Sequence, residues 1–180
     1  LTGADVTFAT SNDAVEFAAS TGQGGDVTLA DISDLTINSG SGAITFGGDI
    51  LGTDNGVSTD VILNSSGAVS VKSIGANGST ADGNINDVTI DGGTITLNGI
   101  GDGDPALGSG AATIGNTATT AMTLNGDFYD TGAATYSTDG AAIVVNKGSD
   151  GTTEFGPTNS AIQFVGGNID VANGTNLSIS

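Results

Sequence analysis

Short runs of alternating apolar and polar residues cover most of this chain. LTI at 35–37 is one such run, and VTF at 6–8 and VTI at 88–90 repeat it. Strict alternation over a few residues is typical of half-buried β-strands. No segment has the apolar period of roughly 3.6 residues that marks a helix, so the pattern predicts an all-β protein. The pattern predicts strands at 5–9, 14–18, 26–30, 35–38, 43–46, 60–63, 68–72, 87–91, 94–98, 111–115, 121–125, 142–146, 152–155, 161–165, 168–172 and 176–180.

Turn-forming residues separate the predicted strands and recur with a longer period. Asn-Gly and Asp-Gly each occur five times, and both pairs tolerate positive φ. Asp-Val also opens predicted strands, at Asp5, Asp26, Asp60 and Asp87. The asparagines that follow strand-like runs are on average about 27 residues apart, and they are Asn12, Asn38, Asn64, Asn98, Asn125, Asn146 and Asn173. A period of three short strands predicts a parallel β-solenoid, with these asparagines stacked as a corner ladder.

The period predicts a single solenoid domain over 1–180. Surface loops are expected at 101–110 and 126–140, where the strand pattern is interrupted. The inward positions of the strands predict a continuous core that contains Phe8, Phe17, Ile37, Phe46, Leu63, Ile90, Leu97 and Leu124. The alternative fold is an antiparallel β-sandwich of the pilin type, because Asn-Gly and Asp-Gly are also hairpin signals.

Charge narrows the choice of partners. The chain has 20 acidic residues against two lysines, a net charge of −18, and it has no cysteine. Such a surface repels nucleic acid and anionic membranes and attracts cations, divalent cations among them. The absence of cysteine excludes disulfides and thiolate sites.

Few residues are candidates for specific chemistry. Asp102 and Asp104, in the run GDGD, are candidates to share a cation such as calcium, and the alternative is a solvated turn. No other cofactor is indicated. Glu16 and Glu154 fall in different coils, and a polysaccharide-acting enzyme needs paired carboxylates or a basic residue. Because the chain lacks arginine, we expect no enzymatic activity, and an enzyme of that kind is a remote alternative.

The runs LTINSGSGAITFGGDI (35–50) and DVTIDGGTITLNGI (87–100) resemble the degenerate repeats of filamentous-haemagglutinin-like proteins. These are β-solenoids of large secreted bacterial surface proteins, and they include autotransporter passengers. The resemblance implies a right-handed parallel β-helix, display outside the cell at the cell surface, and a role in adhesion or matrix building. It carries over no catalytic residue.

A structural role follows as the expected function. The chain is interpreted as an extracellular rod or filament segment, and the alternative is an adhesin passenger that binds a host or surface ligand. Strand-like residues lie close to both Leu1 and Ser180. Uncapped solenoid ends recruit further strands, so we expect self-association into a fibre, end to end or edge to edge. The sequence does not distinguish a complete subunit from a piece of a larger protein.

Overall fold

The computed structural model of this chain is built from short β-strands. It describes residues 5–18, 25–30, 32–53, 59–75, 85–101, 110–148, 151–157 and 160–180. Over these ranges there are eighteen strands and no helix, so no helix there is long and apolar enough to cross a membrane. The strands are β1 (Val6–Ala9), β2 (Val15–Phe17), β3 (Val27–Leu29), β4 (Leu35–Asn38), β5 (Ile44–Gly52), β6 (Val61–Asn64), β7 (Ala68–Ile74), β8 (Val88–Asp91), β9 (Thr94–Leu97), β10 (Ala112–Ile114), β11 (Ala121–Leu124), β12 (Phe128–Thr131), β13 (Ala134–Ser137), β14 (Ile143–Val145), β15 (Gly151–Pro157), β16 (Ile162–Val165), β17 (Ile169–Val171) and β18 (Thr175–Ile179).

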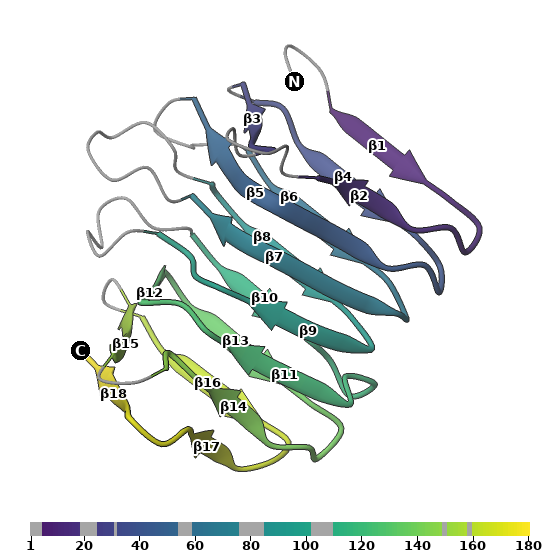
Figure 1. Ribbon diagram of the computed structural model, residues 1–180. Helices are drawn as coiled ribbons and strands as arrows, with labels where there is room; N and C mark the ends of the chain where they lie inside the picture. The colour runs from purple at the N-terminus through teal and green to yellow at the C-terminus, as the bar shows by residue number, and fades with distance from the viewer. Residues whose placement is uncertain are drawn as a thin grey trace.

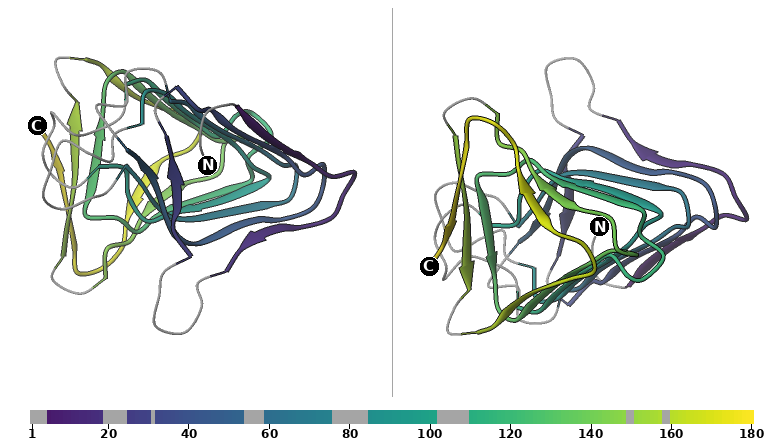
Figure 2. Two further views of the ribbon diagram at one scale, coloured as in Figure 1. Left: turned by 90° about the horizontal axis from the view of Figure 1, so that it is seen from above. Right: turned by 90° about the horizontal axis from the view of Figure 1, so that it is seen from below.

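The strands form three sheets, of which two run the length of the molecule and the third is confined to the C-terminal coils (Figure 1). Sheet A has the order β1-β4-β6-β8-β10-β13-β16, and sheet B has the order β17-β14-β11-β9-β7-β5-β2, with β3 also paired to β5. Sheet C has the order β12-β15-β18. Successive strands of one sheet come from successive coils, so the chain forms a solenoid of about five turns. Viewed along its axis, the stack has a roughly triangular outline (Figure 2).

Every pairing between described strands is parallel, which confirms the solenoid and excludes the antiparallel sandwich. Each turn takes roughly 26 residues, close to the predicted 27. The spacing varies between coils: Val6 pairs with Leu35, 29 residues on, and Ala112 with Ala134, 22 residues on. Seen from the N-terminal end, the coils run clockwise as they recede, so the solenoid is right-handed (Figure 2).

Alternation along each strand places one set of side chains inside the triangle. In β4 and β6 every second residue is buried, and the residues between them are half-exposed. Of the predicted core residues, Ile37, Phe46, Leu63, Ile90, Leu97 and Leu124 are buried. Phe8 and Phe17 are only partly buried, because they belong to the first described coil and nothing described stacks on their outer side.

One predicted loop is wrong. Residues 126–140 contain β12 and β13, which pair with β15 and β16. The alternation there was hidden because Asp130 is buried at an outward position, and the inward position after it holds the polar Thr131. Most of the other predicted loop, 101–110, lies outside the described residues.

Candidate functional site

The surfaces most able to bind a partner are the two ends of the stack, where inward columns of side chains stop. Three such columns run from coil to coil. The first is Phe8–Ile37–Leu63–Ile90–Ile114–Tyr136–Phe164. The second is Phe17–Phe46–Val71–Leu97–Leu124–Val145–Val171. The third is Val27–Ile50–Ile74–Ile100–Tyr129–Phe155–Ile179.

Among the described residues, no coil covers the C-terminal end of these columns. Ile179 is 58% exposed and Val171 is 42% exposed, although both occupy inward positions of their strands. Their partners one coil earlier, Phe155 and Val145, are fully buried. The difference arises because no described coil covers β17 and β18, so apolar surface that the fold normally buries faces solvent.

Aromatic side chains gather at the two ends. The sequence has no aromatic residue between Phe46 and Phe128. At the N-terminal end, Phe17 stacks on Phe46 with ring centroids 4.7 Å apart, and Phe8 meets Phe17 edge-on at 5.6 Å. Near the C-terminal end, Tyr129, Tyr136, Phe155 and Phe164 pack together at 4.9–6.2 Å. Most of these rings are buried in the core, but Phe8, Phe17 and Phe164 are only partly buried. Aromatic residues are over-represented in protein interfaces, so these three make both ends candidate contact surfaces.

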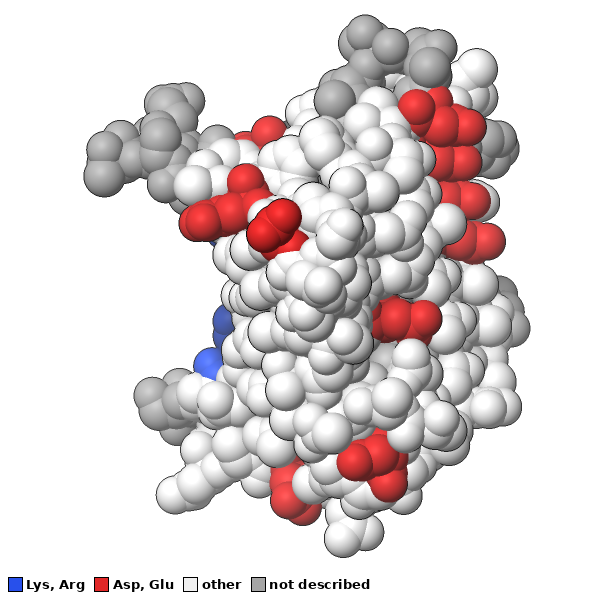
Figure 3. Space-filling model, turned by 90° about the vertical axis from the view of Figure 1, so that its right-hand side faces the viewer, with Lys and Arg blue, Asp and Glu red and all other residues white. Residues whose placement is uncertain are grey.

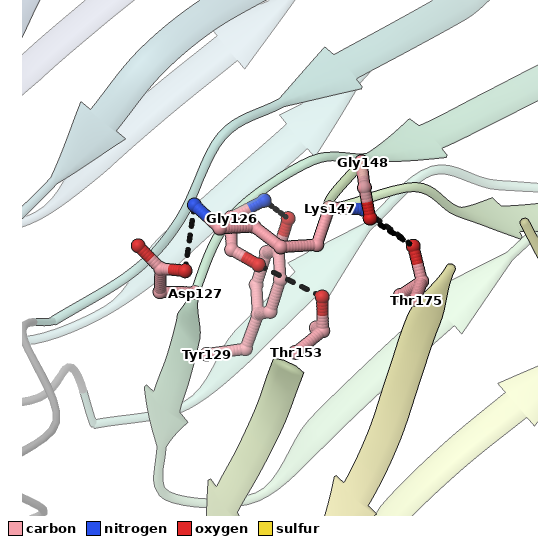
Figure 4. A network of polar contacts seen from close by, with 7 residues as sticks. All are labelled: Gly126, Asp127, Tyr129, Lys147, Gly148, Thr153 and Thr175. Atoms are coloured by element: carbon pink, nitrogen blue, oxygen red, sulfur yellow. Dashed lines mark hydrogen bonds and ion pairs between the residues drawn. The ribbon is translucent and has the colours of Figure 1, made fainter. Parts of the chain in front are cut away.

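Tyr129 anchors a polar network beside the C-terminal aromatic cluster (Figure 4). Its hydroxyl donates to the Leu97 carbonyl at 2.7 Å and accepts from the Gly126 amide at 3.0 Å. The Thr153 hydroxyl donates to the Gly126 carbonyl at 2.9 Å. At the surface of the same corner, Lys147 pairs with Asp127 at 2.6 Å. The network satisfies buried backbone groups where the chain turns from sheet B to sheet C.

The two tyrosines of the chain differ in hydrogen bonding. The Tyr136 hydroxyl is buried and has no hydrogen-bond partner among the described residues. Burial raises the pKa of both hydroxyls above their ordinary value of 10.0. At Tyr129 the Gly126 hydrogen bond partly opposes this rise in pKa and the charge of Asp127 adds to it. At Tyr136 the pKa is raised further by Tyr129 and Asp130.

We expect the protein to lose stability above about pH 10, where tyrosine ionises in the unfolded chain. The folded state keeps both phenol protons because its tyrosine pKa values are raised, while the unfolded state releases them. The free energy of unfolding is therefore unaffected by these groups below that pH and falls as the pH rises further. Denaturant titrations across this range should show the fall. Tyrosinate absorbance, which comes only from these two residues, should appear together with unfolding.

Phenylalanine variants separate the two tyrosines. Tyr129→Phe should cost about 1 kcal/mol at neutral pH, because it removes the hydrogen bond that the Gly126 amide donates to the hydroxyl and one of the hydrogen bonds to the Leu97 carbonyl, which still accepts from the Asn125 N–H. Tyr136→Phe removes a hydroxyl without a partner and should leave stability unchanged or raise it. If the order of the two variants is reversed, or if tyrosinate forms in the folded protein, the burial described here is wrong.

The predicted asparagine ladder is distributed over two corners. At the corner where sheet A turns into sheet B (the A–B corner), the Asn64 side-chain amide donates to Asn38 Oδ1 at 2.9 Å. At the corner after sheet B, Asn125 donates to Asn98 Oδ1 at 3.0 Å, and Asn146 follows β14 one coil later. The two outermost members lie in turns: Asn12 accepts from Ser41, and Asn173 follows β17. The sequence merged two columns because both follow short strands.

A column of aspartates precedes sheet A, and sequence reasoning found only part of it. Asp5, Asp34, Asp60 and Asp87 stand one residue before β1, β4, β6 and β8. Each carboxylate accepts the backbone N–H of the equivalent residue one coil on, at 3.3, 2.9, 3.1 and 2.8 Å. Figure 3 shows acidic side chains stacked in a row near the N-terminal end. The Asp-Val marker missed Asp34, which precedes leucine, and included Asp26, which precedes β3 instead.

The remaining candidates form no site within the described residues. Asp102 and Asp104, the candidate cation ligands, lie outside them. In the part of the chain that is described, no group of three or more acidic, histidine or cysteine side chains could hold a metal ion. Glu16 lies in β2 at the first coil and Glu154 in β15 near the last, so the structure does not bring the two glutamates together.

Comparisons with protein-family models, curated proteins and solved structures find no match for this chain. The fold therefore rests on the structure itself, which shows a parallel β-solenoid of stacked repeats. Membership of the filamentous-haemagglutinin-like proteins stays a prediction from the resemblance of the repeats.

Proposed function

We propose that this chain is an extracellular structural module, a rod or filament segment of a bacterial surface or matrix protein, in which solenoids join end to end. The observation that carries the proposal is the open apolar end of the three inward columns. Phe164, Val171 and Ile179 end the columns at one side, and Phe8, Phe17 and Val27 begin them at the other. A further coil placed on either end would continue the same columns.

The coils of a second copy of the chain could supply this further coil, with its strands paired in the same register. The parallel pairing that joins each coil to the next is repeated throughout sheets A and B, so β16 and β17 of one copy can pair with β1 and β2 of the next. Such a contact is head-to-tail and does not close on itself, so it yields a filament. The resemblance of the repeats to secreted bacterial solenoids supports a location outside the cell. The proposal assigns the chain no catalytic role.

Electron microscopy and solution mass measurement on the 180-residue chain test this proposal. We expect mass to grow with concentration and thin filaments to form, helped by salt because both ends are acidic. Ile179→Asp should abolish assembly, since it puts a charge on an inward column. Val165→Asp adds the same charge at the same end, but Val165 lies one residue beyond the inward Phe164 and points outward, so this variant should still assemble.

Three outcomes would contradict end-to-end joining. The first is a monomer that persists at high concentration and high salt. The second is assembly that survives Ile179→Asp, which would indicate that the copies associate edge to edge and not through the ends of the inward columns. The third is an equal loss of assembly in both variants. Each variant's melting curve should match that of the unchanged chain, because residues 179 and 165 are already largely exposed.

A further inference from the structure

A polar groove crosses the A–B corner in the middle of the solenoid, away from both ends. It arises from turn length. The turns after β6 and β8 have three and two residues, and they lie between turns of five residues after β4 and six residues after β10. The two short turns are therefore recessed between longer ones. The groove has a volume of about 650 Å³.

The groove is lined almost entirely by polar groups. Asn38, Asn64 and Asp91 form its floor in a single column, because they occupy equivalent positions at the ends of β4, β6 and β8. Ser66 and Asn116 add a hydroxyl and an amide from the turns. The column stops at Asp91, since β10 is followed by Gly115, which has no side chain to continue it.

Several of these groups have unused hydrogen-bonding capacity. Asn64 donates to Asn38 Oδ1, and no described residue bonds to the Asn38 amide N–H groups or to Asn64 Oδ1. Within the described part of the chain, no group donates to the Asp91 carboxylate, which is half-buried. Asn116 uses its Oδ1 to accept from Ala118, and its amide N–H groups have no acceptor among the described residues. The groove thus offers donors and acceptors side by side, at the strand spacing of about 4.8 Å.

We propose that this groove binds a neutral, hydroxyl-rich oligosaccharide that lies along the Asn38–Asn64–Asp91 column. A hydroxyl donates and accepts at once, so sugar hydroxyls suit alternating amide and carboxylate groups. The one fixed charge is negative and no lysine lines the groove, so phosphate, sulfate and uronate groups are disfavoured. A single carboxylate is too few ligands for a cation site, because calcium takes about six to eight oxygens. The groove has no aromatic stacking surface, so binding is weak and in the millimolar range.

This binding function is independent of end-to-end joining, because the groove lies at the middle coils. The test is NMR titration of the ¹⁵N-labelled chain with cellotetraose and laminaritetraose as neutral probes, and with tetragalacturonate as the anionic probe. We expect saturable shifts at the A–B corner around residues 64–66 and 91–93 with at least one neutral probe, and no saturation with the anionic one. Asp91→Ala should weaken binding at least about tenfold, the usual loss for a hydrogen bond to a charged group.

Two further variants test whether binding depends on the groove residues rather than on the overall negative charge. Asp170→Ala removes an equally negative side chain from an exposed position on β17 and should leave the affinity unchanged. Asn64→Ala should weaken binding as Asp91→Ala does. No saturable shift with either neutral probe at tens of millimolar, binding that survives Asp91→Ala and Asn64→Ala, or equal binding of tetragalacturonate would each overturn the proposal.

Discussion

Replacing Leu63 by asparagine is expected to unfold the middle of the solenoid, whereas replacing its neighbour Ile62 by asparagine should leave the protein folded. Leu63 is fully buried and stacks between Ile37 and Ile90 of the adjacent coils. Loss of a buried leucine side chain costs about 2–5 kcal/mol, and a buried amide without partners adds a penalty of about 1–3 kcal/mol. Because natural domains are stable by only about 5–15 kcal/mol, this one change removes much of the total.

Ile62 provides the matched control because it has the same size and hydrophobicity but points outward. It pairs with Thr36 and Thr89, so a polar side chain at this position is what the neighbouring coils already have. Asparagine adds no charge to the acidic chain in either variant. Thermal melts by circular dichroism should separate the two, and hydrogen exchange should show lost protection in the coils next to Leu63. If Ile62→Asn is as damaging as Leu63→Asn, the register of β6 is wrong.

The same alternation explains why the sequence predicted the fold so well. Each of the sixteen predicted runs overlaps an observed strand, and β4 (Leu35–Asn38) matches its prediction to the residue. In every coil the inward positions hold apolar residues and the outward positions hold mostly polar ones, so the alternation repeats wherever a strand occurs. Of the two missed strands, β12 lacks this contrast, and β13 has it in burial but starts from a weakly apolar residue. Asp130 is buried in β12, and β13 begins with the small Ala134.

The asparagine columns were harder to predict because periodicity alone does not say which corner a residue occupies. Asn38 is the last residue of β4 in sheet A, whereas Asn98 follows β9 in sheet B, and in the sequence the two positions look alike. Spacings of 21 to 29 residues between paired strands blur the phase further. Only strand pairing resolves them, since it places Asn38 opposite Asn64 and puts Asp91 next in the same column.

The corner groove left almost no signal in the sequence. Its residues are common turn and strand-end types, and Asp91 is one of many aspartates. What creates the groove is a difference in turn length between neighbouring coils, and that difference becomes visible only after the coils are aligned by their pairing.

Gly93→Ala is expected to be the most damaging change that adds a single methyl group at the A–B corner. A Cβ at this position would lie far inside contact distance of the Ser66 carbonyl oxygen in the preceding coil. Gly42 and Gly67, at equivalent positions of earlier coils, meet the carbonyls of Asp13 and Ser41 in the same way. The coils approach this closely because Gly93 N–H donates to the Gly67 carbonyl at 2.8 Å. To admit a methyl group, the backbones must separate and strain that hydrogen bond.

Overpacking of this kind costs about 1–3 kcal/mol, and the rigid backbone partner favours the upper part of that range. Thr94→Ala is the matched control, since it changes the next residue, which is exposed, and also ends in alanine. Denaturant unfolding should place Gly93→Ala well below the unchanged chain and Thr94→Ala close to it. Later coils carry a side chain at the equivalent position, Thr120 and Ala141, so the glycine is a feature of the earlier coils, Gly42 and Gly67 among them. A Gly93→Ala variant as stable as Thr94→Ala would therefore mean that the short corners are not closely packed, and the recess that forms the groove would be lost with them.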